Sequence, residues 1–543
     1  VVAALGLAML ARRRPALRFV GRDLATRSTA PLLAAAASAV GVAVVAALWL
    51  PVWQWDALGY HLPYVNFALV ARGFGAVPDN MPYVSTYPHN VERLIVALRA
   101  MLPDDRLVDV VQVPCALLGA LATAGIARRV GAPRSTALAA GAAWMVVPAV
   151  FIQMPTDYVD IACVAFLLTA IYFVLSAASA SRDEEKRSPA PRLLTSLFSS
   201  ITARRLVMSG LALGIYLGTK PNSPLSASIV ALMLLVVGWR SRERGALLLA
   251  LLLVAIGAEP FVVNAVRHHN PVWPVRVQLG PIVLPGTESM QHLLESGAAA
   301  PHLHGSLLSR VARSWTSLTS PPVFDMRIGG FGPLVLAAMP AALVTLWRRR
   351  DRLALGALLA TVAAPDPSVA RYVMAFPALL LALAAPRAAA LPPRVRPWLG
   401  LLAGAIGFWQ IAYAWPGLTG DGPPLLAYAA MTDAQRADAV GANGPPTPFA
   451  DARKRVGAGE TFAFDQSLDL PYLAWEGDLR YRAVWIPRSL ASAGEAEDFL
   501  QSENVRVVAA AEDSPVGEWL AQRPERFLKL FQCKSAPCSV FAR

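Results

Sequence analysis

The residues best suited to chemistry lie where an apolar run of the chain ends. In 49-WLPVWQWDALGYHLPYVNFALVARG-73 such a run closes with an aromatic cluster, and Asp56 follows it. Because tryptophan rings favour the headgroup level of a bilayer, the cluster places Asp56 at or just outside a membrane surface. The next residues, with Tyr60 and His61 among apolar neighbours, predict a helix lying along that surface. A carboxylate held at this boundary is suited to act as a catalytic base.

Three further groups of ionisable residues stand at the ends of apolar runs. They are Asp157 and Asp160 in 155-PTDYVDIA-162, Lys220 in 218-GTKPN-222, and Asp366 and Arg371 in 366-DPSVARY-372. Charges close to a membrane are costly to hold there, so each group is a candidate functional site. Cations that hold a phosphate, beside a carboxylate that deprotonates a hydroxyl, would suit a polyprenyl-phosphate donor.

Each group also has a structural explanation that needs no chemistry. Asp56 would cap the first N–H groups of the helix after it, and the two acids of 155–162 suit turns or caps. Lys220 would extend its stem toward the headgroups. Arg371 would end a helix at the interface, although its planar guanidinium is better shaped than an ammonium to bind phosphate.

The histidines form no recognisable metal motif. His61, His89, His268 and His269 are spaced unlike any standard set of ligands, and such residues are more often polar parts of loops. The cofactor is therefore unknown at this point. A divalent metal ion remains an open alternative, and Asp56 and Asp157 would be its ligands.

The composition indicates a polytopic membrane protein. Of 543 residues, 55% are hydrophobic and 16% are charged, and the mean hydropathy is +0.46. A soluble protein of this length would need far more charge to cover its surface. The net charge of +13 does not indicate a nucleic-acid partner, because Lys and Arg cluster in short connections between apolar runs.

Eleven apolar runs have the character of membrane spans, and residues 1–10 would be the remnant of a twelfth. The runs are 31–53, 107–127, 135–154, 159–179, 206–218, 225–239, 245–266, 329–347, 353–365, 371–386 and 397–415. Several are shorter than the roughly 20 residues of a straight span, which indicates broken helices. Residue 1 is Val inside an apolar stretch, so we expect the natural chain to begin earlier.

The distribution of basic residues predicts the orientation. The connections at 11–30, 128–134, 180–205, 240–244, 348–352 and 387–396 hold more than twice as many Lys and Arg as the alternate connections do. Basic loops stay in the cytoplasm, so Asp56 and everything after residue 416 are predicted to face the exterior. This pattern is typical of a protein of the bacterial inner membrane.

We expect two domains. Residues 1–416 would form the membrane domain, with long exterior loops at 54–106 and 267–328. In the first loop, 89-HNVERLIVALRAML-102 has apolar residues at helical spacing, with Glu92 elsewhere on the helix. The second loop is rich in Gly, Pro, Ser and His, and is long enough to act as a mobile lid.

Residues 417–543 have the pattern of a small α/β domain outside the cytoplasm. Strand-length apolar runs at 460–464, 480–486, 505–511 and 526–531 alternate with helical patterns such as 494–503, which predicts a partly parallel sheet. The domain lacks a Gly-rich phosphate loop and an obvious catalytic cluster, so we expect it to bind or to stabilise. Cys533 and Cys538 lie five residues apart, and a disulfide between them is left open.

These features together resemble a known superfamily. The motifs WDALGYHLPYV, PTDYVDIA, GLALGIYLGTK, NPVWP and RYVMAFP, in this order, are similar to those of the GT-C integral membrane glycosyltransferases. The chain most resembles bacterial proteins of the dolichyl-phosphate-mannose mannosyltransferase type, over about residues 31–415. The resemblance implies an α-helical enzyme of 11–12 spans that uses a polyprenyl-phosphate sugar. Its catalytic base is an Asp of the first exterior loop, here Asp56.

The resemblance also implies a second acidic position near the third or fourth span, which Asp157 matches better than Asp160. Asp56 is followed by Ala57, whereas some members of the superfamily have two adjacent acids there, so metal dependence stays open. We assign substrate binding to a set of polar residues around Asp56, namely Asp157, Lys220, Arg371, His61, Tyr60 and Glu92.

The sequence thus predicts transfer of a sugar from a polyprenyl-phosphate carrier to a lipid, glycan or protein acceptor at the exterior face. Membrane lipids are the other expected partners. Two alternatives stay open: a transporter or flippase of lipid-linked glycans, and a non-catalytic scaffold of the cell envelope. A flippase would be favoured by charges along both faces of a central path, whereas the candidate groups gather at one face.

Overall fold

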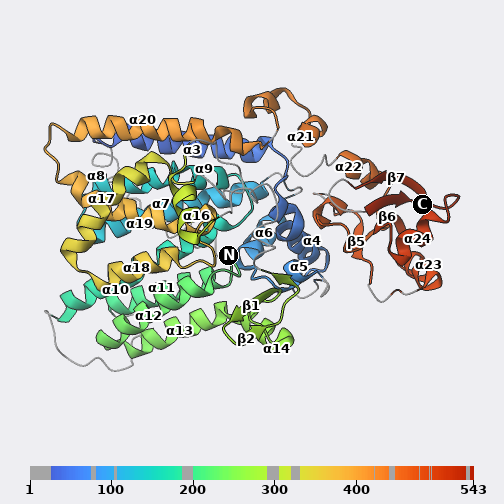
Figure 1. The fold of residues 1–543 in the computed structure, drawn as a ribbon, viewed down its shortest axis with the longest axis horizontal. Coiled ribbons are helices and arrows are strands. Elements are labelled where there is room, and N and C mark those ends of the chain that lie inside the picture. Colours follow the sequence, from blue (N-terminus) through green and yellow to red (C-terminus); the bar gives the residue numbers. More distant parts are fainter. Residues whose placement is uncertain are drawn as a thin grey trace.

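The structure is a computed structural model in which a helical body carries a smaller sheet domain at one end (Figure 1). It describes residues 26–74, 77, 81–102, 105, 107–185, 200–289, 305–318, 330–420, 422–439, 447–475, 477, 479–487, 490, 492–533 and 538–543. The apolar residues 1–10, expected as the remnant of a span, lie outside this part of the chain. The C-terminal sheet domain packs beside the helices of the first exterior loop (Figure 1).

All eleven apolar runs are helices or pairs of helices. They are α3 (Ala30–Trp49), η2 (Val108–Val111) with α7 (Gln112–Arg129), α8 (Arg134–Met145) with α9 (Pro148–Gln153), α10 (Asp160–Glu185), α11 (Ile201–Leu217), α12 (Pro224–Arg240), α13 (Arg244–Gly257) with α14 (Glu259–His268), α17 (Gly332–Arg349), α18 (Arg352–Val362), α19 (Ala375–Ala389) and α20 (Arg396–Ala414). The breaks before α9 and α14 are each followed by a proline in the first turn of the helix. Proline is tolerated there because the first N–H groups of a helix have no intrahelical acceptor.

Four of the described helices are long and apolar enough to cross a membrane alone: Ala30–Trp49, Val108–Arg129, Asp160–Ser181 and Arg396–Leu418. The pair α13 and α14, bent by 50°, would make a fifth. The apolar helices α12, α18 and α19 are shorter. The chain is therefore a helical multi-span membrane protein, and the larger number of eleven or twelve spans stays a prediction.

Small residues let the helices of the body approach closely. A Cβ atom at Gly214 on α11 would lie 2.3 Å from the carbonyl oxygen of Leu253 on α13, and one at Gly257 would lie 2.0 Å from the carbonyl oxygen of Gly214. Between α7 and α8, a Cβ atom at Gly141 would lie 2.3 Å from the carbonyl oxygen of Ala120. These contacts between backbones are typical of helix packing in membranes, where water does not drive helices together.

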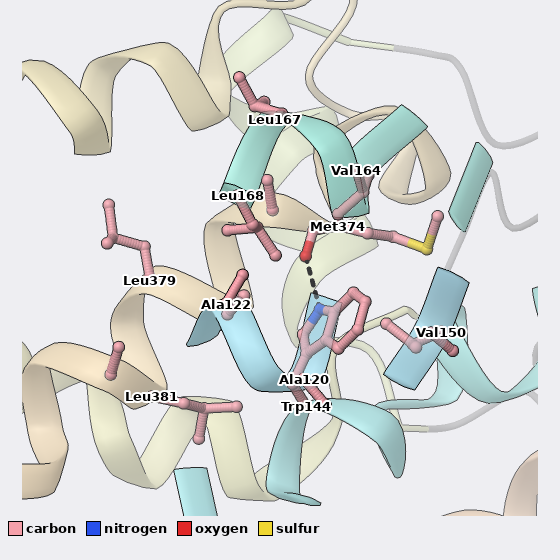
Figure 2. Packing of buried hydrophobic residues seen from close by; sticks show 14 of the residues in the cluster. Ala120, Ala122, Trp144, Val150, Val164, Leu167, Leu168, Met374, Leu379 and Leu381 are labelled. Atoms are coloured by element: carbon pink, nitrogen blue, oxygen red, sulfur yellow. Dashed lines mark hydrogen bonds between the residues drawn. The ribbon is translucent and has the colours of Figure 1, made fainter. Parts of the chain in front are cut away.

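Trp144 ties α8 to the chain segment that enters α19. Its ring is fully buried, and its Nε1–H donates to the carbonyl oxygen of Met374 at 2.9 Å, as Figure 2 shows. A Cβ atom at Gly119 would lie 2.5 Å from this ring, so the absence of a side chain there makes room for it. Met374 directly follows η4 (Ala370–Val373), so Trp144 supports the short helix that carries Arg371.

The described part of the loop at 54–106, which is predicted to be exterior and is called the first exterior loop, is helical. It contains η1 (Ala57–His61), a single π-helical turn, followed by α4 (Leu62–Val70), α5 (Pro82–Thr86) and α6 (Asn90–Arg99). Both helices that the sequence predicts there, after Asp56 and within 89–102, are present. Between them lies the one-turn helix α5, which begins at a proline suited to a first turn.

The second exterior loop is more ordered than its composition indicates. Its described part forms a three-stranded sheet of order β2-β1-β3, made by β1 (Val275–Leu279), β2 (Ile282–Leu284) and β3 (Glu288–Ser289). It also contains the helix α16 (Leu307–Thr316), which Ser306 caps by accepting a hydrogen bond from the Ser309 N–H. A role of this loop as a lid stays a prediction.

The C-terminal domain has a mixed five-stranded sheet of order β5-β4-β6-β8-β7, with β4 parallel to β5 and β6. Its elements are α22 (Thr447–Arg453), β4 (Thr461–Phe464), η7 (Pro471–Ala474), β5 (Arg482–Trp485), α23 (Ala493–Ser502), β6 (Val505–Ala511), α24 (Pro515–Ala521), β7 (Leu528–Gln532) and β8 (Cys538–Ala542). The predicted α/β domain with a partly parallel sheet is confirmed. Cys533 and Cys538 form a disulfide between the antiparallel strands β7 and β8.

We expect Gly214→Ala to lower the thermal stability of the purified protein in detergent. The added methyl group would meet the Leu253 carbonyl oxygen and force α11 away from α13, and overpacking of this kind costs about 1–3 kcal/mol. Gly41→Ala on α3 is the matched control, because no atom lies within 4 Å of its added Cβ. Equal melting temperatures for the two variants would contradict this account of the packing.

Candidate active site

Four segments far apart in the sequence bring two carboxylates and two cations together. Arg371 places Nη1 2.9 Å from Oδ2 of Asp56 and 3.7 Å from Oδ2 of Asp160. Lys220 places Nζ 2.8 Å from the other oxygen of Asp160. The side chain of Asp56 keeps 14% of its surface exposed, and the other three are buried. We call these four residues the charge cluster.

The π-helical turn η1 positions Asp56. Asp56 is the residue immediately before this turn, and its backbone N–H donates to the hydroxyl of Tyr158 at 3.1 Å. The Asp56 side chain does not cap the helix that follows it, because its carboxylate accepts a hydrogen bond from Arg371 instead. Single π-helical turns are rare and occur often at functional sites.

A strained backbone position places Asp160. The residue before it, Val159, has φ of +57°, a left-handed conformation that is costly for a β-branched residue. Gln112 on α7 holds this turn: its Nε2 donates to the carbonyl oxygen of Thr156 at 3.0 Å, and its Oε1 accepts from the Ala162 N–H at 3.1 Å. The turn therefore delivers Asp160 as the first residue of α10.

Arg371 is fixed by aromatic rings as well as by carboxylates. Its guanidinium lies 5.1 Å from the ring centroid of Tyr158 and 5.2 Å from that of Tyr372, which are cation–π distances. Asp366, the other charge of this turn, lies apart from the cluster. It accepts from the Ser368 N–H at 2.8 Å and pairs with Arg310 of α16 at 3.2 Å, so it shapes the turn that leads to Arg371.

The cations keep the Asp56 carboxylate ionised. Burial by itself would raise the pKa of Asp56, but Arg371, Lys220 and His61 outweigh it and lower the pKa below its usual value. Asp56 is therefore an anion at neutral pH, with Arg371 as its direct partner. A carboxylate in this state becomes an effective base only after its partner cation has bound another anion.

A small pocket opens beside the charge cluster, between α10, α11, α12 and residues 363–372. The charged residues that line it are Asp160, Lys220 and Arg371. Its remaining lining is mostly apolar, with Val164, Leu167 and Ala363 among it. The two cations thus line a cavity whose walls are partly polar and partly apolar.

Asp157 lies outside the charge cluster. It is fully buried, and both of its carboxylate oxygens lack a hydrogen-bond partner among the described residues. Burial raises the pKa of Asp157 to about 8, with the nearby acids Glu92 and Asp56 adding to the effect. Its assignment to substrate binding stays a prediction, whereas Asp160, three residues later, contacts both cations.

His61 and Glu92 form a buried pair behind η1. The Nδ1 of His61 lies 2.6 Å from Oε1 of Glu92, and the Nδ1 of His89 lies 3.3 Å from the same oxygen. His89 also donates from Nε2 to the carbonyl oxygen of Val84 at 2.8 Å and stacks on Tyr64. Since η1 ends at His61, this contact anchors the turn that follows Asp56 to α6.

Tyr60 belongs to a cluster of three tyrosines next to η1. Its ring meets that of Tyr87 edge to face at 5.4 Å, and Tyr87 meets Tyr83 at 5.2 Å. The pKa of Tyr60 is raised by burial and by the negative charge of Asp56. Its hydroxyl is therefore neutral and remains a hydrogen-bond donor beside Asp56.

The donor set does not fit a divalent metal ion. Within the described residues no three His, Cys, Asp or Glu side chains gather in a way that would hold one. Asp56 and Asp160 are each paired with a cation, which already satisfies their charge. Asp157, the other suggested ligand, lies outside the charge cluster. The mechanism proposed below therefore gives no role to a metal ion.

Comparison with known proteins identifies the fold. No protein-family model matches the chain, and no curated protein is significantly similar to it in sequence. The structure of ArnT from Cupriavidus metallidurans bound to undecaprenyl phosphate matches with a TM-score of 0.54, covering 93% of this chain and 96% of ArnT at 16% identity. The chain has the fold of ArnT. The apo structure of ArnT matches similarly, with a TM-score of 0.52 at 15% identity and coverages of 93% and 97%.

This match confirms the predicted helical multi-span fold with a C-terminal sheet domain. The Archaeoglobus fulgidus oligosaccharyltransferase also matches, over 90% of this chain and 71% of its own, but its TM-score of 0.39 at 14% identity is too low to support an argument. The finer resemblance to the mannosyltransferase type receives no support from these comparisons. At such identities the likeness to ArnT concerns the fold alone.

Sequence reasoning missed the importance of Asp160 and Tyr158. Both lie in 155-PTDYVDIA-162, the motif that it singled out, but the motif does not show which acid turns toward the cations. The spacing of three between the two acids would place them on one face only in a regular helix. The left-handed residue Val159 breaks that regularity, and no pattern in the sequence predicts it.

We expect the stabilising effect of Glu92 to depend on pH. Burial opposes its ionisation, but His89 and His61 outweigh burial and lower the pKa of Glu92 to about 2, from an ordinary 4.5. The ionised side chain therefore stabilises the folded protein above about pH 4.5 by about 3 kcal/mol, and this contribution is lost as the pH falls toward 2. The thermal stability of Glu92→Gln in detergent should lie below that of the wild type at pH 6, with a smaller gap at pH 3.

Glu525→Gln is the control for this measurement, because Glu525 is exposed on the C-terminal domain. Its stability should follow that of the wild type at every pH. A gap between Glu92→Gln and the wild type that does not change between pH 6 and pH 3 would contradict the paired, ionised state of Glu92.

Proposed function

We propose that the protein is a membrane glycosyltransferase that moves a sugar from a polyprenyl-phosphate carrier to a hydroxyl-bearing acceptor. The observation that carries this proposal is the charge cluster, in which Arg371 pairs with Asp56 and both Arg371 and Lys220 line a partly apolar pocket. Two cations in a pocket whose other walls are mostly apolar suit a phosphate that is joined to a hydrocarbon chain. The ArnT structure, whose fold this chain shares, contains undecaprenyl phosphate, which is a ligand of this chemistry.

Binding of the donor would rearrange the charges of the cluster. In the free protein Arg371 is paired with Asp56, and Lys220 with Asp160. A phosphate that takes the Arg371 guanidinium replaces Asp56 as its partner, because a guanidinium binds phosphate through two parallel hydrogen bonds. Asp56 then loses the interaction that lowers its pKa and becomes a stronger base at the moment when the donor is in place.

Asp56 would act on the acceptor hydroxyl. The hydroxyl oxygen attacks the anomeric carbon and forms a new C–O bond, while its proton passes to the Asp56 carboxylate. The bond between the anomeric carbon and the phosphate oxygen breaks, and the electron pair leaves with the polyprenyl phosphate. Lys220 and Arg371 stabilise the charge that develops on that phosphate. A single displacement of this kind inverts the anomeric carbon.

Four details of the proposal rest on the sequence alone. They are the mannosyltransferase type, the exterior active site, the inner membrane location and the acceptor class of lipid, glycan or protein. Four of the six residues assigned to substrate binding separate into two groups by position. Lys220 and Arg371 would contact the phosphate, whereas His61 and Glu92 lie behind η1 and support it.

We expect Asp56→Asn to reduce sugar transfer by about 10²- to 10⁴-fold, because the amide keeps the size of the side chain but cannot accept the proton. The assay is release of sugar from a panel of polyprenyl-phosphate sugars by the purified protein in detergent. Asp451→Asn, at an exposed surface pair of the C-terminal domain, should keep full activity. Full activity of a folded Asp56→Asn variant would show that Asp56 is not the base.

The same assay tests the alternatives. Absence of turnover in the wild type with every donor, together with movement of the lipid across vesicles, would favour a flippase. Absence of sugar turnover and of lipid movement would favour a non-catalytic scaffold.

We expect Lys220→Gln to raise the KM for the donor by roughly 10- to 100-fold, because one charge-assisted contact to the phosphate is lost. The kcat should fall as well, because Lys220 also stabilises the charge that develops on the leaving phosphate. Lys454→Gln is the matched control on an exposed lysine. An unchanged KM in a variant that retains its thermal stability would remove Lys220 from the phosphate site.

A further inference from the structure

We propose that residues 469–475 and 477 of the C-terminal domain position the turn that carries Asp56, so that this domain is part of the catalytic architecture. The proposal rests on the proposed function of Asp56. We call these residues the docking segment. It contains the short helix η7, and the structure places it directly against η1.

The docking segment and the first exterior loop share one hydrophobic core. Side chains from both sides lie in a single buried cluster, among them Leu58, Tyr60, Leu62 and Phe67 from the loop and Leu470, Tyr472, Leu473 and Trp475 from the segment. The ring of Trp475 is fully buried and meets Phe67 edge to face at 4.8 Å. Because apolar side chains fill this contact, the two parts move as one packed unit.

Polar contacts join the far end of the segment to the end of the same loop. The hydroxyl of Tyr472 donates to Oδ2 of Asp105. Arg99, the last residue of α6, donates from Nη2 to the carbonyl oxygen of Gly477 at 3.0 Å. A Cβ atom at Gly477 would lie 2.7 Å from Oδ1 of Asp105, so the carboxylate fits only because this residue has no side chain.

The near end of the segment touches the π-helical turn itself. A Cβ atom at Gly59 would lie 3.4 Å from the ring of Trp55 and 3.6 Å from the carbonyl oxygen of Asp469. Gly59 is the third residue after Asp56, and Trp55 directly precedes Asp56. The backbone of the docking segment therefore lies against the turn that sets the direction of the Asp56 carboxylate.

The C-terminal domain holds the docking segment from its other side. Arg453 of α22 donates from Nη1 to the carbonyl oxygen of Leu473 at 2.6 Å. The hydroxyl of Tyr481 donates to the carbonyl oxygen of Ala474 at 2.8 Å. These contacts fix the segment within its own domain, so a firmly held element supports η1 and restricts its motion.

Tyr472→Phe tests this role, because it removes the hydroxyl that bonds to Asp105 and keeps the buried ring. We expect kcat for sugar transfer to fall about 3- to 10-fold, as for the loss of one hydrogen bond that orients the base. The KM for the donor should stay within twofold, since Lys220 and Arg371 lie on other segments. Amide hydrogen exchange in the peptide 53–65 should become faster.

Thr461→Val is the matched control within the same domain. Thr461 is buried, and its hydroxyl donates to the carbonyl oxygen of Glu503, the residue after α23, and not to the first exterior loop. This variant loses one buried hydroxyl contact as well, so it should lower the thermal stability of the protein. It should leave kcat and the exchange of residues 53–65 unchanged.

The exchange measurement decides the inference without reference to activity. Unchanged exchange of residues 53–65 in Tyr472→Phe, or equally faster exchange in Thr461→Val, would overturn the positioning role. A third outcome combines faster exchange in Tyr472→Phe alone with a wild-type protein that transfers no sugar from any donor. It would support the mechanical coupling and reject the proposed function. Faster exchange with kcat unchanged would reject a catalytic consequence of the coupling.

Discussion

The rest of the structure depends on one constraint, the need to pair the charges that are buried at the end of the helical body. Arg371 and Lys220 are almost without solvent, and a buried cation is tolerated only beside a compensating anion. Asp160 bridges the two cations, and Asp56 completes the pairing of Arg371. Since each of the four comes from a different segment, the arrangement exists only when the whole helical body is folded.

Much of the fold serves to bring these segments to one place. The close packing of α7 on α8 and of α11 on α13 uses glycines at which even a methyl group would meet backbone. Trp144 supports the segment after Arg371, and Gln112 holds the turn before α10. Irregular backbone occurs at the site itself, in η1 and at Val159. Strain of this kind persists where the surrounding packing determines it.

The C-terminal domain changes the interpretation of the first exterior loop. Its composition is that of an ordinary soluble domain, for which binding or stabilisation is the natural expectation. In the structure its core continues into the core of the loop, through Trp475 and Phe67, and its backbone reaches η1. The turn with Asp56 is therefore supported from behind by the pair His61 and Glu92, and from the side by another domain.

The sequence by itself determined the class of the protein, the ranges of its apolar helices, the α/β pattern after residue 417 and the four polar groups at the ends of spans. These follow from local composition and periodicity, which a single chain displays directly. It did not distinguish Asp160 from Asp157, because a left-handed valine between them redirects the chain. It did not pair Arg371 with Asp56, Glu92 with His61, or Tyr472 with Asp105, since these contacts join residues 31 to 367 positions apart. Such pairings depend on how helices pack in space, and only the tertiary structure decided them.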